Sequence, residues 1–403
     1  MVKALYQKSK FRKVMLILAL LSLNILEQSA GVISATIPLM AKTFNGYSIV
    51  QVEMATTIIS IFVTVFVMAS GVISNWIGQK QTAVLGLLVA AVSSVIPVFL
   101  SNFHVVIISR AIFGVGIGLA NPLAISLIGE FFSGDTLANL MGWRSAVAGL
   151  GQSLMTFCAG YLLTINWHVA YTVYFLFIPA LIFFVFFVPE PEKFGLNADN
   201  SNEEKKEKES KFTWKGFSTV LGLALILFAT MVISMIAYIK LAEFYVESHI
   251  GTPTQASTVL SIFGIAQLVG SALFGIVYKL FKNWTLYIGM LFSAIPLIGI
   301  GYAHSNLVVT VMFILMGLLG GLAIPYIFTK VAGVTNTKNA PLFNGIVLVG
   351  SNMGSFCAPI LGKVLGGASA RLAMLHGGYL LFIITIVVIL IMEVTRRMKR
   401  VMQ

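Results

Sequence analysis

The hydrophobic positions of the chain fall into long apolar runs that short polar stretches separate. A helix needs about 20 apolar residues to cross a hydrocarbon layer about 30 Å thick. Measured against this length, the runs predict twelve membrane-spanning helices, at about 14–37, 50–75, 83–100, 104–128, 143–164, 169–188, 217–239, 256–278, 284–303, 307–328, 342–366 and 373–394. The short turns at 101–103 and 304–306 indicate antiparallel helix hairpins.

The composition supports this interpretation and excludes several classes of protein. The chain is 58% hydrophobic and 10% charged, whereas about 25% of a soluble domain is charged. Both cysteines, Cys158 and Cys357, fall inside predicted spans, which leaves no disulfide framework. We find no histidine-rich metal spacing, no serine–histidine–aspartate set and no phosphate-binding glycine loop. We therefore expect no enzyme activity, no metal and no cofactor other than an ion gradient, with protons as the expected ion.

The basic residues predict the orientation in the membrane. Of the 26 Lys and Arg residues, all but five fall on one face of the twelve predicted spans; the exceptions are Lys42, Arg110, Lys240, Lys363 and Arg371. Because basic residues concentrate on the cytoplasmic side, both termini are predicted to be cytoplasmic, in the cell membrane. The net charge of +12 is then a topology signal, and we expect no nucleic-acid partner. All five tryptophans fall at predicted span ends: Trp76, Trp143, Trp167, Trp214 and Trp284.

Two similar halves flank a polar linker. The predicted domains are residues 1–188 and 217–403, each with six helices, and residues 189–216 form a charged cytoplasmic linker. Gly114-x-x-x-Gly118-Leu-Ala-x-Pro122 recurs as Gly317-x-x-x-Gly321-Leu-Ala-x-Pro325, 203 residues later. A second match places Gly151, Phe157 and Cys158 against Gly350, Phe356 and Cys357, 199 residues later. Parallel repeats of this kind surround a central cavity in one large class of transporters.

The loop between the second and third spans resembles a motif of the major facilitator superfamily. That family shows Gly-x-Leu-Ala-Asp-Arg-x-Gly-Arg-Lys, and this chain has Gly71, Asn75, Trp76, Gly78, Gln79 and Lys80 at the corresponding positions. Arg110 and Gly114 are similar to the Arg-x-x-x-Gly pattern of the fourth span. In the fifth span, Met155 and Thr156 replace the Gly-Pro pair of proton-driven drug exporters. This departure argues against a plain drug antiporter and makes the pattern more similar to the organic-ion branches. The chain is identified as a twelve-helix member that resembles the drug and organic-ion branches.

This resemblance implies an all-α fold of two six-helix bundles, and a gate formed by Gly71, Asn75, Gly78 and Lys80. It also implies a monomeric secondary transporter that works by alternating access on a small amphipathic organic solute, such as a bile-salt-like anion or a drug-like compound, coupled to protons. A proton-driven multidrug antiporter, an uncoupled facilitator or exchanger, and a transporter-like solute sensor are the alternatives. Import and export both stay open.

Ionisable groups inside a bilayer need a partner or a function. Glu27 lies 13 residues into the first predicted span, on a polar face with Asn24 and Gln28, and Arg110 lies at a similar depth in the fourth. Two hypotheses follow for this pair. It is either a structural ion pair or a proton-coupling site in which burial and Arg110 together set the ionisation of Glu27.

A second group of polar and aromatic residues is predicted to contact substrate. Lys240 and Glu243 lie three residues apart in the seventh span, where Lys240 either snorkels to the outer surface or binds a charged solute. Amides in mid-span serve either helix contacts or ligand binding. The candidates for substrate binding are Asn24, Gln28, Gln152, Tyr238, Lys240, Glu243, Gln267, Asn352 and Phe356.

Overall fold

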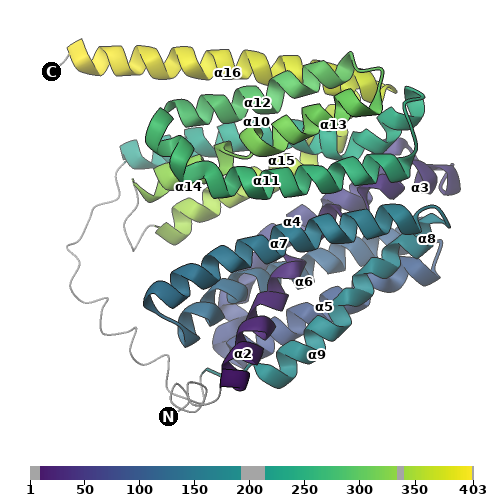
Figure 1. Ribbon diagram of the computed structural model, residues 1–403, viewed down its shortest axis with the longest axis vertical. Coiled ribbons are helices and arrows are strands. Elements are labelled where there is room, and N and C mark those ends of the chain that lie inside the picture. Colours follow the sequence, from purple (N-terminus) through teal and green to yellow (C-terminus); the bar gives the residue numbers. More distant parts are fainter. Residues whose placement is uncertain (1–9, 192–213, 334–339, 402–403) are drawn as a thin grey trace. The chain divides into compact units, whose positions relative to one another are not determined.

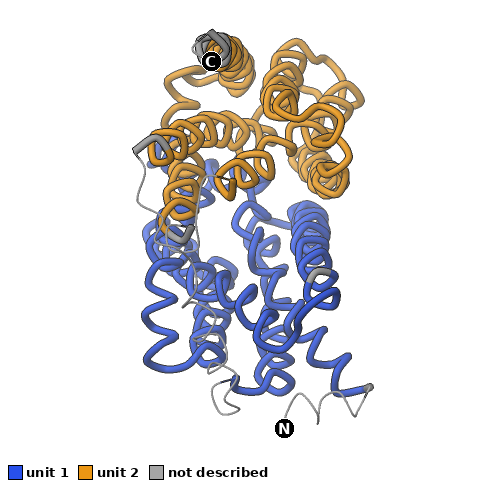
Figure 2. Tube along the Cα trace, turned by 90° about the vertical axis from the view of Figure 1, so that its left-hand side faces the viewer, with its two compact units in different colours: residues 1–211 blue, residues 212–403 orange. Residues whose placement is uncertain are grey.

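The computed structural model describes residues 10–191, 214–333 and 340–401. It divides into two compact units, residues 1–211 and residues 212–403, which Figure 2 shows in blue and orange. The regular secondary structure of the described residues is helical throughout (Figure 1). This confirms the all-α membrane fold. The predicted linker, residues 189–216, lies mostly outside the described residues.

Unit 1 begins with a broken helix and continues with five long helical segments. The first span runs from α2 (Lys10–Ser22) through three 3-10 turns to α3 (Ile37–Thr43) and bends by 49° between residues 26 and 29. Four continuous helices follow: α4 (Ile49–Ile77), α5 (Gln79–Phe99), α6 (Phe103–Phe131) and α7 (Gly134–Leu162). The sixth segment consists of α8 (Trp167–Ala170), a 3-10 stretch (Tyr171–Leu176) and α9 (Phe177–Phe187).

Unit 2 repeats this order of six segments but differs in its first, fourth and sixth segments. Its first helix, α10 (Trp214–Glu247), is continuous, and α11 (Pro253–Phe281) and α12 (Trp284–Gly301) follow it. The fourth segment joins α13 (Asn306–Leu315) and α14 (Ala323–Ala332) through a π-helical turn at Met316–Gly320. The last two are α15 (Ala340–Gly366) and α16 (Ala370–Val401).

Most of these helices are long and apolar enough to span a bilayer. Among the described residues ten meet that standard, and the bent pair at the start makes eleven. The one remaining long helix, α7, has 29 residues but carries Asp135, Asn139, Arg144 and Gln152 along its length. It begins at Gly134, nine residues before the predicted start of the fifth span, because the prediction began where the apolar run begins.

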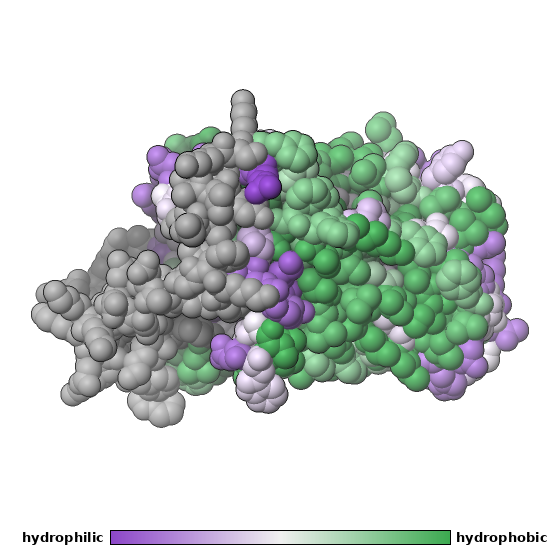
Figure 3. Space-filling model, turned by 90° about the horizontal axis from the view of Figure 1, so that it is seen from below, coloured by the Kyte–Doolittle hydropathy of each residue, from purple (hydrophilic) through white to green (hydrophobic). Residues whose placement is uncertain are grey.

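Large apolar side chains cover the outer surface of the helices. Phe99, Leu307 and Val364 are each more than 70% exposed, which is expected of side chains that face lipid. Figure 3 shows one such face, where hydrophobic residues cover a broad area and hydrophilic residues lie to its right and to its left. Small residues lie inside, where they let helices approach closely.

Glycines at equivalent places make the close helix contacts in the two units. A Cβ atom on Gly114 of α6 would lie 2.6 Å from the carbonyl oxygen of Ile59 in α4. A Cβ atom on Gly317 would lie 2.8 Å from the carbonyl oxygen of Phe263 in α11. The two glycines are 203 residues apart, and their partners 204. The Gly-x-x-x-Gly repeat is therefore a packing motif, and the contacts confirm the repetition of the halves.

The second repeat also makes equivalent contacts. Gly151 of α7 lies against Ile25 in the first span, and Gly350 of α15 lies against Ala224 in α10. Both members of the second pair follow those of the first by 199 residues. This register makes it possible to compare the first helices of the two units residue by residue.

Candidate functional site

The break in the first span results from polar side chains that bond back to their own backbone. Such side chains compete with the helical hydrogen bonds and favour tighter turns. Five of them donate to a carbonyl three residues earlier, at distances between 2.7 and 3.2 Å: Ser22, Asn24, Ser29, Ser34 and Thr36. These bonds satisfy backbone groups that a bilayer would otherwise leave without partners. The polar face predicted for this span therefore supports the break itself.

Asn24 and Gln28, two predicted substrate residues, lie at this break in different surroundings. Asn24 is fully buried, and its amide nitrogen donates to the carbonyls of Leu20 and Leu21. The oxygen of that amide has no hydrogen-bond partner among the described residues. Gln28 is exposed. Of the two, only Gln28 has a side chain that is open to a solute in this structure.

Glu27 forms an ion pair at the break, with a partner other than the predicted one. Its Oε1 atom lies 2.8 Å from Nη2 of Arg144 in α7, and the two side chains are 26% and 15% exposed. The fifth span was predicted to begin at residue 143, which would put Arg144 at its cytoplasmic end. The earlier start of α7 instead places Arg144 ten residues inside the helix. Oε2 of Glu27 and Nε of Arg144 are buried and have no hydrogen-bond partner in the described part of the chain.

The predicted pairing of Glu27 with Arg110 is wrong. Arg110 is fully buried in α6 and binds backbone oxygens: its Nη2 donates to the carbonyl of Ala30 at 2.8 Å and its Nε to the carbonyl of Ala55 at 3.1 Å. Nη2 also donates to the hydroxyl of Tyr174 at 3.2 Å, and that hydroxyl donates to the carbonyl of Ser29 at 3.0 Å. Arg110 does lie beside the first span near residue 30, but the sequence contains no information on which helix faces which.

Aromatic rings complete the surroundings of Arg110. Its guanidinium carbon lies 4.7 Å from the ring centre of Phe113, 5.2 Å from that of Tyr174 and 5.7 Å from that of Tyr171. Cation–π contacts of this kind stabilise a cation that has been removed from water. Arg110 is therefore fixed in place by groups on several sides.

In unit 2, Lys240 and Glu243 form the ion pair that their spacing suggests. Nζ of Lys240 lies 2.8 Å from Oε2 of Glu243, with side-chain exposures of 2% and 20%. Lys240 lies beside Gly362 of α15, so it does not extend to the surface as the snorkelling alternative requires. Tyr238 is buried nearby in the chain, with its ring 6.3 Å from Phe263.

Glu247, four residues after Glu243 at the end of α10, has a structural role. Its carboxylate accepts hydrogen bonds from the hydroxyl of Ser369 and from the backbone N–H groups of Ala370 and Arg371. It thereby caps the start of α16, where free N–H groups favour a negative charge. The side chain of Arg371 in turn donates to the carbonyl of Gly301 at 3.1 Å, at the end of α12.

The remaining substrate candidates are partly exposed. Gln267 of α11 lies against Gly321, so its side chain contributes to helix packing. Gln152 of α7 and both Asn352 and Phe356 of α15 are intermediate in exposure. The role of these four residues in binding stays a prediction.

The predicted gate loop joins α4 to α5 within unit 1. Gly78 ends α4 with φ of 93°, a conformation that favours glycine. Lys80 donates to the carbonyl of Val185 at the end of α9, at 2.9 Å. Gly71 and Asn75 are exposed. A hydrogen-bond network connects this loop to α6, and it runs through Gln79.

Gln79 occupies the position of a family arginine and connects the loop to α6. Its amide oxygen accepts from the hydroxyl of Ser126 at 2.8 Å, and its amide nitrogen donates to Glu130 at 3.4 Å. In unit 2, Asn283 follows Gln79 by 204 residues and accepts from the hydroxyl of Tyr326 at 3.1 Å. Each unit therefore ties this loop to its fourth segment with a neutral hydrogen bond.

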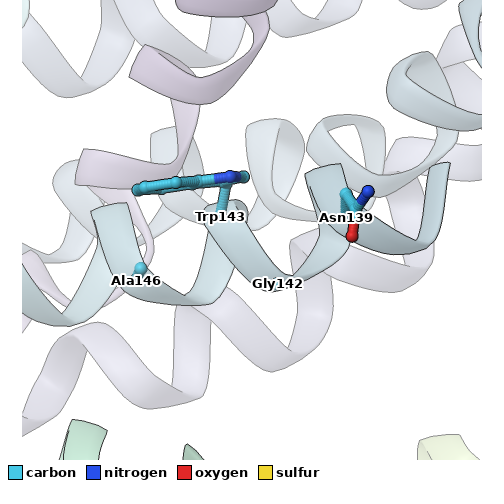
Figure 4. A pocket seen from close by; sticks show the side chains of 4 residues that line it. All are labelled: Asn139, Gly142, Trp143 and Ala146. Carbon is cyan, nitrogen blue, oxygen red and sulfur yellow. The ribbon is translucent and has the colours of Figure 1, made fainter. Parts of the chain in front are cut away.

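Sequence reasoning missed two features of unit 1. Glu53, one turn into α4, is fully buried, and an acid inside an apolar run was a signal that could have identified it. Trp143 was expected at a span end but lies well inside α7, 62% exposed. With Asn139, Gly142 and Ala146 it lines an open pocket of about 360 Å³ on one face of that helix (Figure 4).

The sequence profile of the Major Facilitator Superfamily matches residues 18–247 and 223–401. The chain belongs to the Major Facilitator Superfamily. It is therefore a multi-pass membrane transporter of small molecules and not an enzyme, as the loop motif and the repeat predicted.

Two curated relatives resemble the chain at moderate identity. The quinolone resistance protein NorA of Staphylococcus aureus (strain MSSA476) is 25% identical over 311 residues, which is 73% of this chain and 75% of that protein. Monosaccharide-sensing protein 2 of Arabidopsis thaliana is 25% identical over 182 residues, which is 43% of this chain but only 25% of that protein.

Solved structures share the fold. A D-xylose-proton symporter superposes with a TM-score of 0.75 at 17% identity, covering 94% of this chain and 97% of that one. A POT family transporter in complex with 5-aminolevulinic acid gives a TM-score of 0.73 at 12% identity, covering 93% and 95%. At these identities the likeness establishes the fold and says nothing of the substrate.

Proposed function

We propose that the protein is a proton-coupled secondary transporter of small amphipathic organic solutes. The observation that carries the proposal is the Glu27–Arg144 ion pair, formed at a break in a membrane-spanning helix. Ionisable groups in such positions commonly belong to ion pathways. The similarity to a quinolone resistance protein supports an amphipathic organic substrate and export as the direction.

The pair provides a simple means of coupling. A carboxylate paired with an arginine is stabilised in its charged form, and one that loses the arginine in an apolar site is stabilised in its neutral form. A movement of the first span against α7 would lengthen the 2.8 Å contact and so favour uptake of a proton by Glu27. Restoring the contact would favour release of that proton. Proton occupancy and conformation are linked in this way.

The decisive experiment compares two modes of transport in proteoliposomes. Purified protein is tested with a quinolone, a cationic dye and a bile salt, first under an imposed pH gradient and then by exchange without a gradient. Glu27→Gln keeps the shape of the side chain but removes its charge. We expect this variant to lose gradient-driven accumulation and to retain exchange of the same solute within about twofold.

Glu247→Gln is the matched control, because it makes the same replacement at a carboxylate that caps α16. The amide oxygen of the new glutamine would still accept hydrogen bonds from the start of that helix. It should retain gradient-driven accumulation. Near wild-type accumulation by Glu27→Gln would refute a coupling role for Glu27. If the wild-type protein moves solute at a rate independent of the gradient, it is an uncoupled facilitator or exchanger.

Lys240 is proposed to recognise an anionic group of the solute. It is 2% exposed and held by one carboxylate oxygen of Glu243, so a solute carboxylate that reaches this pair would compete with Glu243. Lys240→Ala should weaken binding of a bile salt about tenfold or more, since hydrogen bonds to charged groups contribute about 1.5–3 kcal/mol. Binding of a neutral solute should change less than twofold. Equal losses for both solutes would contradict this role.

The proposed setting is the cell membrane, with a monomeric protein whose termini are both cytoplasmic. The supporting observation is the distribution of basic residues along the sequence. The proposed gate comprises Gly71, Asn75, Gly78 and Lys80, supported by the hydrogen bond from Lys80 to the end of α9.

A further inference from the structure

We infer that Arg110 and Tyr174 act as positioning residues that hold the break of the first span, and thereby hold Glu27 against Arg144. The inference rests on the proposed function, because it gives these residues a part in proton coupling. Their contacts with the first span are with its backbone just after the break, at Ser29 and Ala30.

The first step concerns the carbonyl groups at the break. A helix that unwinds inside a bilayer exposes backbone oxygens that need donors. The carbonyls of Ser29 and Ala30 lie two and three residues after Glu27, and they accept from Tyr174 at 3.0 Å and from Arg110 at 2.8 Å. The two side chains thus supply donors from outside the first span.

The second step concerns how firmly these donors are fixed. Nε of Arg110 also donates to the carbonyl of Ala55 in α4, at 3.1 Å, and Phe113 covers the guanidinium at 4.7 Å. Tyr174 belongs to the 3-10 stretch between α8 and α9 and is fully buried. Arg110 and Tyr174 with these contacts are called the Arg110–Tyr174 clamp below. The clamp connects the first span to α4, to α6 and to the sixth segment of the same unit.

The third step concerns what the clamp controls. Glu27 and Gln28 lie at the 49° bend, between the two helical pieces. Arg144 approaches from α7, whereas the hydrogen bonds described for Arg110 and Tyr174 go to the first span and to α4. The direction in which Glu27 points is set by the bend, and the bend is held by the bonds to Ser29 and Ala30. Loosening those bonds should weaken the Glu27–Arg144 contact without altering either charged residue.

Tyrosines in the same segment provide a matched pair of variants. Tyr174→Phe removes the hydroxyl that donates to Ser29 and accepts from Arg110. Tyr171→Phe removes an equally buried hydroxyl three residues earlier, whose contact is the sulfur of Met40 at 3.7 Å. Both rings lie near the same guanidinium, so the variants differ chiefly in the bonds to the break.

The test combines hydrogen exchange in lipid nanodiscs with the transport assay described above. In Tyr174→Phe we expect exchange of the 24–36 amides to rise roughly three- to tenfold, the factor expected for one lost hydrogen bond. We also expect gradient-driven accumulation to fall at least threefold relative to gradient-free exchange. Tyr171→Phe should match the wild-type protein in both measurements.

Wild-type exchange of the 24–36 amides in Tyr174→Phe would overturn the inference, as would an equal rise in Tyr171→Phe. If amide exchange rises only in Tyr174→Phe while its gradient-driven accumulation relative to gradient-free exchange is unchanged, the positioning role is overturned, since a merely structural bond gives that result. If the wild-type protein itself shows no response to a pH gradient, the proposed function fails. The amide exchange of the two variants then decides by itself whether the clamp holds the break.

Discussion

The pairing of Glu27 with Arg144 can be tested directly by a double-mutant cycle. Glu27→Gln and Arg144→Gln each remove one charge and keep an amide of similar shape. Each single variant leaves the other charge in a mostly buried place, with side chains 26% and 15% exposed in the wild-type structure. Both single variants should therefore lower stability, and the double variant should lose less than the sum of the two.

The size of the coupling follows from the geometry. Two unit charges 4 Å apart attract by about 4 kcal/mol at an effective dielectric constant of about 20. The cost of removing both from water offsets much of this attraction, and partial exposure screens the remainder. We expect a coupling free energy of about 1–2 kcal/mol, at the lower end of the range for hydrogen bonds to charged groups.

The assay is thermal unfolding in detergent or nanodiscs, at one pH and one lipid composition. For a unit of about 200 residues, 1 kcal/mol shifts the melting temperature by about 2–4 °C. The expected coupling therefore appears as a departure of about 2–8 °C from additivity. The comparison cycle combines Glu27→Gln with Arg110→Gln, and its coupling should be smaller, because Arg110 bonds to the backbone at Ala30 and acts on Glu27 only through the break.

An additive result for Glu27 with Arg144, together with coupling of 1 kcal/mol or more for Glu27 with Arg110, would refute our reasoning. It would show that the pairing expected from depth alone is the real one, and that the break of the first span does not direct Glu27 towards α7. Coupling in neither cycle would mean that Glu27 is neutral or solvated in the measured state.

Three further predictions follow from packing, capping and topology. Gly116→Ala places a methyl group against the backbone of α5, with contacts from 2.6 Å, and should lower the free energy of unfolding by about 1–3 kcal/mol. Gly129→Ala, in the same helix, meets open space and should leave stability unchanged or slightly higher. Thermal unfolding measures both. Glu247→Ala should lower stability by about 0.5–2 kcal/mol through loss of the cap of α16, and Glu247→Gln should recover part of it. Cysteines introduced at Ser201 and Ser305 should react with impermeant reagents from opposite sides of the membrane, and labelling of both from outside would contradict the topology.

Much of the architecture could be predicted because the bilayer leaves few solutions for a long apolar run. The runs predicted helices, and the glycine repeat predicted where two of them approach closely. The start of α7 could not be found in this way, since its first turns are polar. Ser133 followed by Asp135 is a helix-start signal, and giving that signal more weight would have placed Arg144 inside the span.

The site was predicted less well, for a physical reason. Distance along a helix fixes the depth of a side chain, and both Glu27 and Arg110 were placed at a reasonable depth. Which residues meet depends on the rotation of each helix about its axis and on bends. The break at residues 23–36 changes that rotation, and it depends on several weak side-chain bonds acting together. Glu27 therefore turned out to pair with Arg144, and Arg110 with the backbone.

Comparison of the two units shows why the proposed chemistry belongs to the first. The Ile25–Gly151 and Ala224–Gly350 contacts show that equivalent residues of the two units are 199 positions apart. By this spacing Glu27 and Arg144 correspond to Ile226 and Phe343, two apolar residues that cannot form an ion pair.

The same correspondence explains why the first helix is broken in unit 1 and continuous in unit 2. Among the side chains that bond back to the first span, Asn24, Ser29 and Ser34 correspond to Leu223, Phe228 and Ile233, which cannot compete for backbone carbonyls. Accordingly α10 continues unbroken from Trp214 to Glu247. Both units share the glycine contacts that hold the bundle, and within the described residues only unit 1 combines a broken first helix with an ion-paired acid at the break. The repeat supplies the scaffold, and a few polar substitutions in one copy supply the candidate proton site.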